Sequence, residues 1–94
     1  MIEWDELKAL INFQKHGVSF TEAATCFEDD KIFLYHDVSH SKNEDRYISI
    51  AKSFKGKLLM MVFTVRREPN GEKIYRIISA RQASKKERKV YPRS

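Results

Sequence analysis

The first regular hydrophobic pattern in the chain predicts an α-helix over residues 5–16. Apolar side chains recur there with the 3.6-residue spacing of one helix face, at Leu7, Leu10 and Ile11. Asp5 stands where its carboxylate can cap the first turn. Gly17 stands where a left-handed residue is expected to end the helix.

A second, shorter helix is expected from Ser19 to about Phe27. Ser19 and Glu22 have the spacing of a capping box, in which each side chain satisfies a free backbone N–H of the first turn. Behind this cap, the apolar residues form a single stripe: Phe20, Ala23, Ala24 and Phe27.

Four later segments have the pattern of β-strands, at residues 31–37, 46–54, 57–66 and 73–80. The third contains the most apolar run of the chain and is predicted to be the central strand. The last three strands are separated by short turns at Lys55-Gly56 and Pro69-Asn70-Gly71, which predicts an antiparallel meander.

A second capping box, from Ser84 to Glu87, predicts a short C-terminal helix. The expected order is therefore α-α-β-β-β-β-α. We predict a single α+β domain over residues 1–94, with a mostly antiparallel four-stranded sheet packed with helices.

Composition limits the functional classes. In 94 residues there is one cysteine, Cys26, which excludes an internal disulfide and a multi-cysteine zinc site. We expect Cys26 to pack in the core as a small hydrophobic residue. No apolar run approaches the length of a membrane span, and the acidic N-terminus does not resemble a signal peptide, so we expect a cytoplasmic protein.

Charge is distributed unevenly along the chain. Residues 1–65 contain 8 Lys and Arg against 10 Asp and Glu, whereas residues 66–94 contain 10 against 3. A basic segment on a neutral-to-acidic body is typical of a surface that binds nucleic acid. A solvated basic tail explains the same composition equally well.

Three blocks of the sequence resemble the BrnT toxin family. The N-terminal block comprises Trp4-Asp5, Asn12, Lys15-His16-Gly17-Val18, Phe20, Ala23-Ala24 and Phe27. The middle block comprises Asp37, His40-Ser41, Glu44 and Arg46-Tyr47. The C-terminal block comprises Arg76-Ile77-Ile78-Ser79-Ala80-Arg81, Ala83, Glu87-Arg88 and Tyr91. Together, in this order and spacing, the blocks are specific.

The resemblance implies a toxin of a type II toxin–antitoxin module with a RelE-like ribonuclease fold. Such a toxin cleaves RNA and arrests translation. Its implied partner is a DNA-binding BrnA-like antitoxin, in a heterotetramer of two toxins and two antitoxins. Contact with operator DNA would come only through the antitoxin.

A ribonuclease that works without a metal can use the RNA 2′-hydroxyl as nucleophile. The protein must then accept a proton, stabilise charge on phosphorus and protonate the leaving oxygen. Arginine suits the second task, so we predict phosphate contacts from Arg46, Arg76 and Arg81. Strict alternation places Arg76 and Arg81 on opposite faces of a strand, so both can serve one site only if a bulge intervenes or Arg81 has left the strand.

The remaining candidates each have a structural alternative. Lys15, His16 and Glu44 are candidates for catalysis, but His16 can simply end its helix and Glu44 can belong to a local cap. Tyr91 and His40 are candidates for RNA contact, although Tyr91 can equally be a packing residue. The C-terminal cations are either RNA-backbone contacts or a solvated helix face: Lys85, Lys86, Arg88 and Lys89.

We predict no cofactor and no catalytic metal, because the spacing of His36, Asp37 and His40 fits no common metal motif. The alternative to an enzyme is a non-catalytic nucleic-acid-binding or corepressor module, which the basic charge fits equally well.

Overall fold

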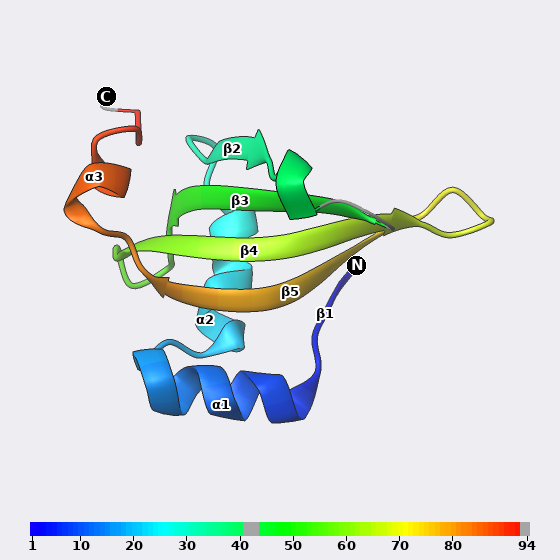
Figure 1. Ribbon diagram of the computed structural model, residues 1–94, viewed down its shortest axis with the longest axis horizontal. Helices are drawn as coiled ribbons and strands as arrows, with labels where there is room; N and C mark the ends of the chain where they lie inside the picture. The colour runs from blue at the N-terminus through cyan, green and yellow to red at the C-terminus, as the bar shows by residue number, and fades with distance from the viewer. Residues whose placement is uncertain (41–43, 93–94) are drawn as a thin grey trace.

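The computed structural model describes residues 1–40 and 44–92 and contains one five-stranded sheet with helices (Figure 1). The strands are β1 (Ile2–Glu3), β2 (Phe33–His36), β3 (Asp45–Lys52), β4 (Leu58–Arg67) and β5 (Lys73–Gln82). The helices are α1 (Glu6–His16), α2 (Phe20–Ala24) and α3 (Lys85–Arg88). The described residues also form two 3₁₀ turns, η1 (Thr25–Glu28) and η2 (Val38–His40).

The predicted α+β class is confirmed, and the predicted meander is present. The sheet order is β1-β5-β4-β3-β2, which makes β4 central, and β2 to β5 pair antiparallel. The predicted strand number and element order were wrong at the N-terminus, because β1 adds a fifth strand parallel to β5. Two residues are too few to show an alternating pattern, so the sequence carried no signal for this strand.

Helix α1 has the predicted extent, but its apolar stripe is exposed to solvent. Asp5 caps its first turn, and Gly17 ends it in the left-handed conformation with a φ of 71°. Leu7, Leu10 and Ile11 are 66%, 55% and 53% exposed, whereas Asn12, on the opposite side of the helix, is buried. The spacing therefore identified the helix correctly without identifying the face that meets the sheet.

Asn12 attaches α1 to the edge of β5. Its Nδ2 donates hydrogen bonds to the carbonyls of Ala80, at 2.8 Å, and Val18, at 3.1 Å. Its Oδ1 accepts from the backbone N–H of Ala80 at 3.1 Å. The side-chain amide thus satisfies the backbone groups that a further strand would have satisfied at this edge.

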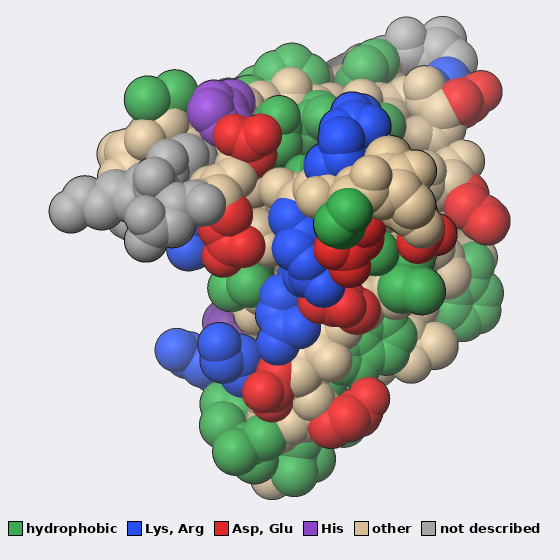
Figure 2. Space-filling view, turned by 90° about the vertical axis from the view of Figure 1, so that its right-hand side faces the viewer, with side chains coloured by type: hydrophobic (Ala, Val, Ile, Leu, Met, Phe, Trp, Pro, Cys, Tyr) green, Lys and Arg blue, Asp and Glu red, His purple; other side chains and the backbone are tan. Residues whose placement is uncertain are grey.

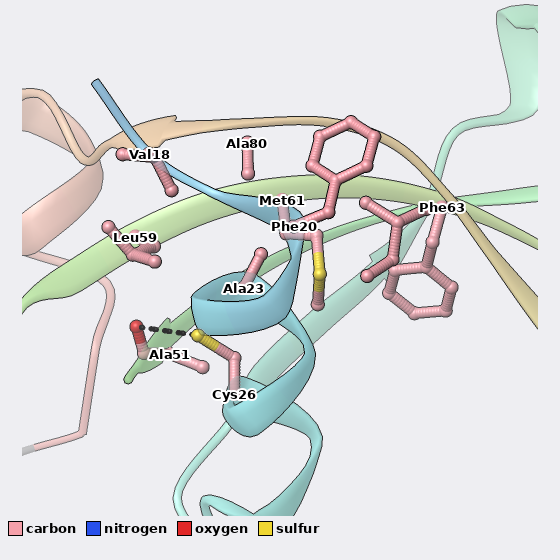
Figure 3. Close-up of a cluster of buried hydrophobic side chains, with 10 residues drawn as sticks. Val18, Phe20, Ala23, Cys26, Ala51, Leu59, Met61, Phe63 and Ala80 are labelled. Atoms are coloured by element: carbon pink, nitrogen blue, oxygen red, sulfur yellow. Dashed lines mark hydrogen bonds between the residues drawn. The ribbon is translucent and has the colours of Figure 1, made fainter. Parts of the chain in front are cut away.

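The main hydrophobic core lies between α2, η1 and the back of the sheet (Figure 3). Phe20 and Ala23 from α2 pack there against Leu59 and Met61 from β4. Cys26 is fully buried, as predicted, and its Sγ lies 3.8 Å from the carbonyl of Ala51. Burial raises the pKa of the Cys26 thiol to about 12, so this thiol is an inert packing group.

The face of the sheet away from α2, toward the viewer in Figure 1, is called the front face below. A smaller cluster packs on it, comprising Ile50, Met60, Val62, Ala83 and Tyr91. Tyr91 follows α3, so the C-terminal segment covers one end of this face. Within the described residues, no helix is long and apolar enough to span a membrane.

Candidate functional site

A β-bulge in β5 brings Arg76 and Arg81 to the same face of the sheet. Phe63 pairs with Ile77, but Val62 pairs with Ser79, so Ile78 is an extra residue without a partner on β4. One extra residue inverts the alternation beyond it. Arg76 lies opposite Thr64 and Arg81 opposite Met60, both on the front face.

Arg46 and Arg76 lie in one row across this face. Thr64 of the central strand pairs with Arg46 on one side and Arg76 on the other, and Glu3 of β1 pairs with Arg76. The side chains of Arg46, Arg76 and Arg81 are 33%, 35% and 36% exposed, so all three remain accessible to an anion.

Arg81 lies in a different row, nearer α3. The rows of Arg76 and Arg81 are separated by four residue steps on β4, from Met60 to Thr64. At the usual rise of a strand this is about 13 Å. The arrangement therefore suits contacts with separate phosphates of one strand better than a shared contact with a single phosphate.

Each of these arginines has a carboxylate partner. Arg76 and Arg66 both bind Glu3, at 2.7 and 3.0 Å, and Arg46 lies 3.6 Å from Asp37. Hydrogen bonds from Arg66 and Arg76 lower the pKa of Glu3. A guanidinium has five N–H donors, so an arginine oriented in this way retains donors for a phosphate.

Glu87 orients Arg81 and caps α3 at the same time. Its two carboxylate oxygens accept hydrogen bonds from Nη1 and Nη2 of Arg81, at 2.8 and 2.9 Å. Oε1 also accepts from the backbone N–H of Ser84, and the Ser84 hydroxyl accepts from the N–H of Glu87, which confirms the predicted capping box. Glu87 thus couples the position of Arg81 to the start of α3.

This coupling predicts that Glu87 contributes stability at neutral pH and not in acid. Hydrogen bonds from Arg81 lower the pKa of Glu87 below its ordinary 4.5. The contribution is therefore complete above pH 4.5 and is lost as the pH falls through the lower pKa of the folded state. We expect wild type to exceed Glu87→Gln in free energy of unfolding at pH 7, and the difference to shrink below about pH 4. Urea titrations at several pH values measure it, and a constant difference from pH 7 to pH 3 would contradict it.

The other predicted catalytic residues lie at opposite ends of the sheet. Lys15 and His16 are exposed at the end of α1, one turn after Asn12, which binds Ala80 beside Arg81. Glu44 precedes β3 at the end that carries Arg46. The hydrogen bond to Glu3 is the main cause of the raised pKa of Arg66, and the charge of Glu44 adds a smaller contribution. The side chain of His40 lies outside the described part of the structure.

Tyr91 is covered rather than presented to solvent. The residue is 9% exposed, and its hydroxyl donates a hydrogen bond of 2.6 Å to Asp29. Burial and this carboxylate raise the pKa of Tyr91 to about 12. In this conformation, stacking of a base on Tyr91 would require the C-terminal segment to move.

The basic residues of α3 are solvent-exposed, at Lys85, Lys86, Arg88 and Lys89. At the opposite end of the sheet, cations and carboxylates are interleaved (Figure 2), in agreement with the Arg66–Glu3 and Arg66–Glu68 ion pairs. Exposed cations thus lie on α3, next to the Arg81–Glu87 ion pair. Among residues 1–40 and 44–92, no group of three His, Cys, Asp or Glu side chains could hold a metal ion.

Comparison with protein-family models shows which family the chain belongs to. Residues 4–87 match the model of the family described as "Ribonuclease toxin, BrnT, of type II toxin-antitoxin system". The chain belongs to the BrnT family. The resemblance seen in the sequence is thereby confirmed over nearly the whole chain.

A solved structure supports the same fold for this BrnT family member. The crystal structure of the Brucella abortus ribonuclease toxin BrnT has a TM-score of 0.61 and 21% sequence identity. The match covers 90% of this chain and 100% of that one. A comparison with curated protein sequences gave no match.

Sequence reasoning missed two features of this BrnT family member that bear on the site. One is the pair of exposed rings on the edge strand β2, Phe33 and Tyr35, which share the front face with Arg81. Their alternation in the predicted strand was visible, but not the face they occupy. The other is the role of Glu3, because the strand that contains it gave no signal.

Proposed function

We propose that this BrnT family member is an endoribonuclease toxin that cleaves RNA by attack of the 2′-hydroxyl, without a metal. The 2′-oxygen bonds to phosphorus and the bond to the 5′-oxygen breaks, which leaves a cyclic phosphate and a 5′-hydroxyl. One proton leaves the 2′-hydroxyl and one is supplied to the 5′-oxygen. Cleavage of cellular RNA by this route would inhibit translation.

The observation that supports this proposal is the placement of three partly exposed arginines on one face of the sheet. Arg46 and Arg76 would bind one phosphate of an RNA strand lying along the front face, and Arg81 another phosphate of the same strand. Preorganised guanidinium groups stabilise the charge that develops on phosphorus. The carboxylate partners of the arginines hold them in place before the substrate arrives.

The groups proposed to transfer protons lie in two different places, so substitutions can distinguish between them. His16 and Lys15 lie at the Arg81 end of the sheet, whereas Glu44 lies at the Arg46 end. The rows of Arg81 and Arg46 are four residue steps apart on β4, about 13 Å, so we assign the two sets of groups to different phosphates. We place the scissile phosphate near Arg81, so His16→Asn should remove cleavage; loss of cleavage in Glu44→Gln instead would place that phosphate near Arg46.

The expected partner is a BrnA-like DNA-binding antitoxin, in a heterotetramer of two toxins and two antitoxins that contacts operator DNA through the antitoxin alone. Membership of a type II toxin–antitoxin family supports a protein partner. A RelE-like fold and a cytoplasmic location also stay predictions.

Cleavage of RNA by the purified protein in excess EDTA tests the mechanism. We expect cleavage at an undiminished rate, with products that end in a cyclic phosphate. Loss of cleavage in EDTA that magnesium restores would contradict a metal-free reaction. If the folded protein binds RNA but cuts none, the alternative of a non-catalytic nucleic-acid-binding or corepressor module is favoured.

A further inference from the structure

A groove beside Arg81 has the composition of a nucleotide-binding site. It has a volume of about 450 Å³ and lies between β2, β3 and the C-terminal segment. Its walls comprise Phe33, Tyr35, Ile50, Lys86, Glu87 and Val90. A hollow of this size is within the range of small-ligand sites.

The register of the sheet connects this groove directly to Arg81. Phe33 pairs with Ile50, Ile50 with Met60, and Met60 with Arg81, so one row of the front face runs from an exposed ring to the guanidinium. Tyr35 lies in the next row, opposite Ile48. Glu87, which binds Arg81 with both oxygens, is itself a wall of the groove.

Two aromatic rings at this groove are open to solvent. Phe33 is 36% exposed and Tyr35 is 42% exposed, and their ring centroids lie 5.8 Å apart. Exposed rings on a sheet surface are platforms on which single-stranded bases stack. Tyr91, by contrast, is covered by its own packing.

The charges around the groove favour an anionic ligand. Lys86 is exposed at one wall, and Arg81 lies at the end of the row. The carboxylate of Glu87 already accepts hydrogen bonds from Arg81 and from the Ser84 N–H. A nucleotide supplies both groups that this surface needs, a flat base for the rings and a phosphate for the cations.

We propose that this groove binds a base of the RNA substrate on Phe33 and Tyr35, next to the phosphate that Arg81 contacts. The proposal rests on the proposed ribonuclease function and identifies the part of the protein that holds the substrate's base. Since every base has a stacking face, this site gives affinity with little sequence preference.

The test measures binding of a 2′-O-methyl RNA oligonucleotide of mixed sequence, which lacks the attacking hydroxyl, by fluorescence anisotropy. We expect Tyr35→Ala and Phe33→Ala each to weaken binding about tenfold, the loss typical of one stacked base. Tyr35→Phe keeps the ring and should bind like wild type. Phe54→Ala is the matched control, because Phe54 is an aromatic residue 70% exposed in the turn between β3 and β4.

Salt dependence separates stacking from charge. Lys86→Ala should reduce the slope of log affinity against log salt by about one, as for a lost phosphate contact, whereas Tyr35→Ala should leave the slope unchanged. Thermal unfolding of each variant checks that the fold is retained. For a variant that does not fold, the milder Phe33→Leu replaces Phe33→Ala and Tyr35→Leu replaces Tyr35→Ala.

The outcomes are distinguishable. If wild type binds and cleaves RNA but Tyr35→Ala and Phe33→Ala bind like wild type, this proposal is wrong and the proposed function stands. The same holds if Phe54→Ala weakens binding as much. Unchanged RNA affinity combined with lost affinity for the antitoxin would make the groove a protein-binding site instead. If wild type neither binds nor cleaves RNA, the proposed function itself fails.

Discussion

Arg81→Ala is expected to reduce kcat/KM for RNA cleavage by about 100-fold or more, the usual loss when one preorganised donor to a developing oxyanion is removed. Arg81 is one-third exposed on the front face, and Glu87 holds its guanidinium with both carboxylate oxygens. The charge and the planar fork are both lost in the variant. Initial rates on a fluorogenic RNA measure the change.

Two variants sharpen this test. Arg81→Lys keeps the charge without the bidentate fork, and we expect it to recover only part of the activity. Arg67→Ala is a matched control, because Arg67 binds the carbonyl of Gly71 in the turn between β4 and β5, and it should cleave like wild type. Wild-type rates for a folded Arg81→Ala would remove Arg81 from the mechanism.

Asn12→Leu is expected to destabilise the protein by about 3 kcal/mol. The substitution leaves the N–H and the carbonyl of Ala80, and the carbonyl of Val18, without their hydrogen-bond partner in a buried position. Each unsatisfied buried group costs about 1–3 kcal/mol, and local relaxation recovers part of the sum. Urea denaturation measures the loss in free energy of unfolding.

Asn12→Asp and Gln14→Ala are the controls for this prediction. The aspartate has the shape of asparagine and can still accept from the N–H of Ala80, but it turns a carboxylate toward two carbonyls, so it should also be destabilising. Gln14 is exposed on the same helix, and Gln14→Ala should change stability by less than about 0.5 kcal/mol. If Asn12→Leu were as stable as wild type, the amide would not be what attaches α1 to β5.

Much of the fold could be predicted because it depends on local signals. Asp5 and Gly17 bound α1, Ser84 and Glu87 form the second capping box, and Pro69-Asn70-Gly71 turns β4 into β5. The continuous apolar run of β4 indicated its central position, since a strand covered on both faces has no polar alternation.

The remaining features of the fold depend on contacts between residues that are distant in the sequence. Spacing shows that α1 has two unlike faces, but only the free edge of β5 explains why the polar Asn12 turns inward. The capping box expected at Ser19 is half formed, because Glu22 turns its carboxylate to the buried hydroxyl of Ser53 instead, at 2.7 Å. The carboxylate of Glu22 thus binds Ser53, which is distant in the sequence, in place of the nearby backbone N–H of Ser19.

The candidate site, too, could be predicted only in part, because its geometry depends on contacts between residues distant in the sequence. Arg46, Arg76 and Arg81 could be selected by residue type, and a bulge was the condition for placing the last two together. Whether the condition held could not be decided from the sequence, because no residue in the Ile77-Ile78-Ser79 segment marks an irregularity. The pairing of these arginines with carboxylates could not be predicted either, since Glu3, for example, reaches Arg76 from the opposite end of the chain.

The attachment of Asn12 also limits how copies of this protein can join sheet to sheet. On the β5 border, β1 occupies the positions of Tyr75 and Arg76, and the amide of Asn12 occupies those of Ala80. An incoming strand finds no continuous ladder there, whereas β2 forms the other border with all four of its residues exposed. Any strand added to this sheet would therefore have to pair along β2, and a molecule paired there has no second open border from which a fibre could grow.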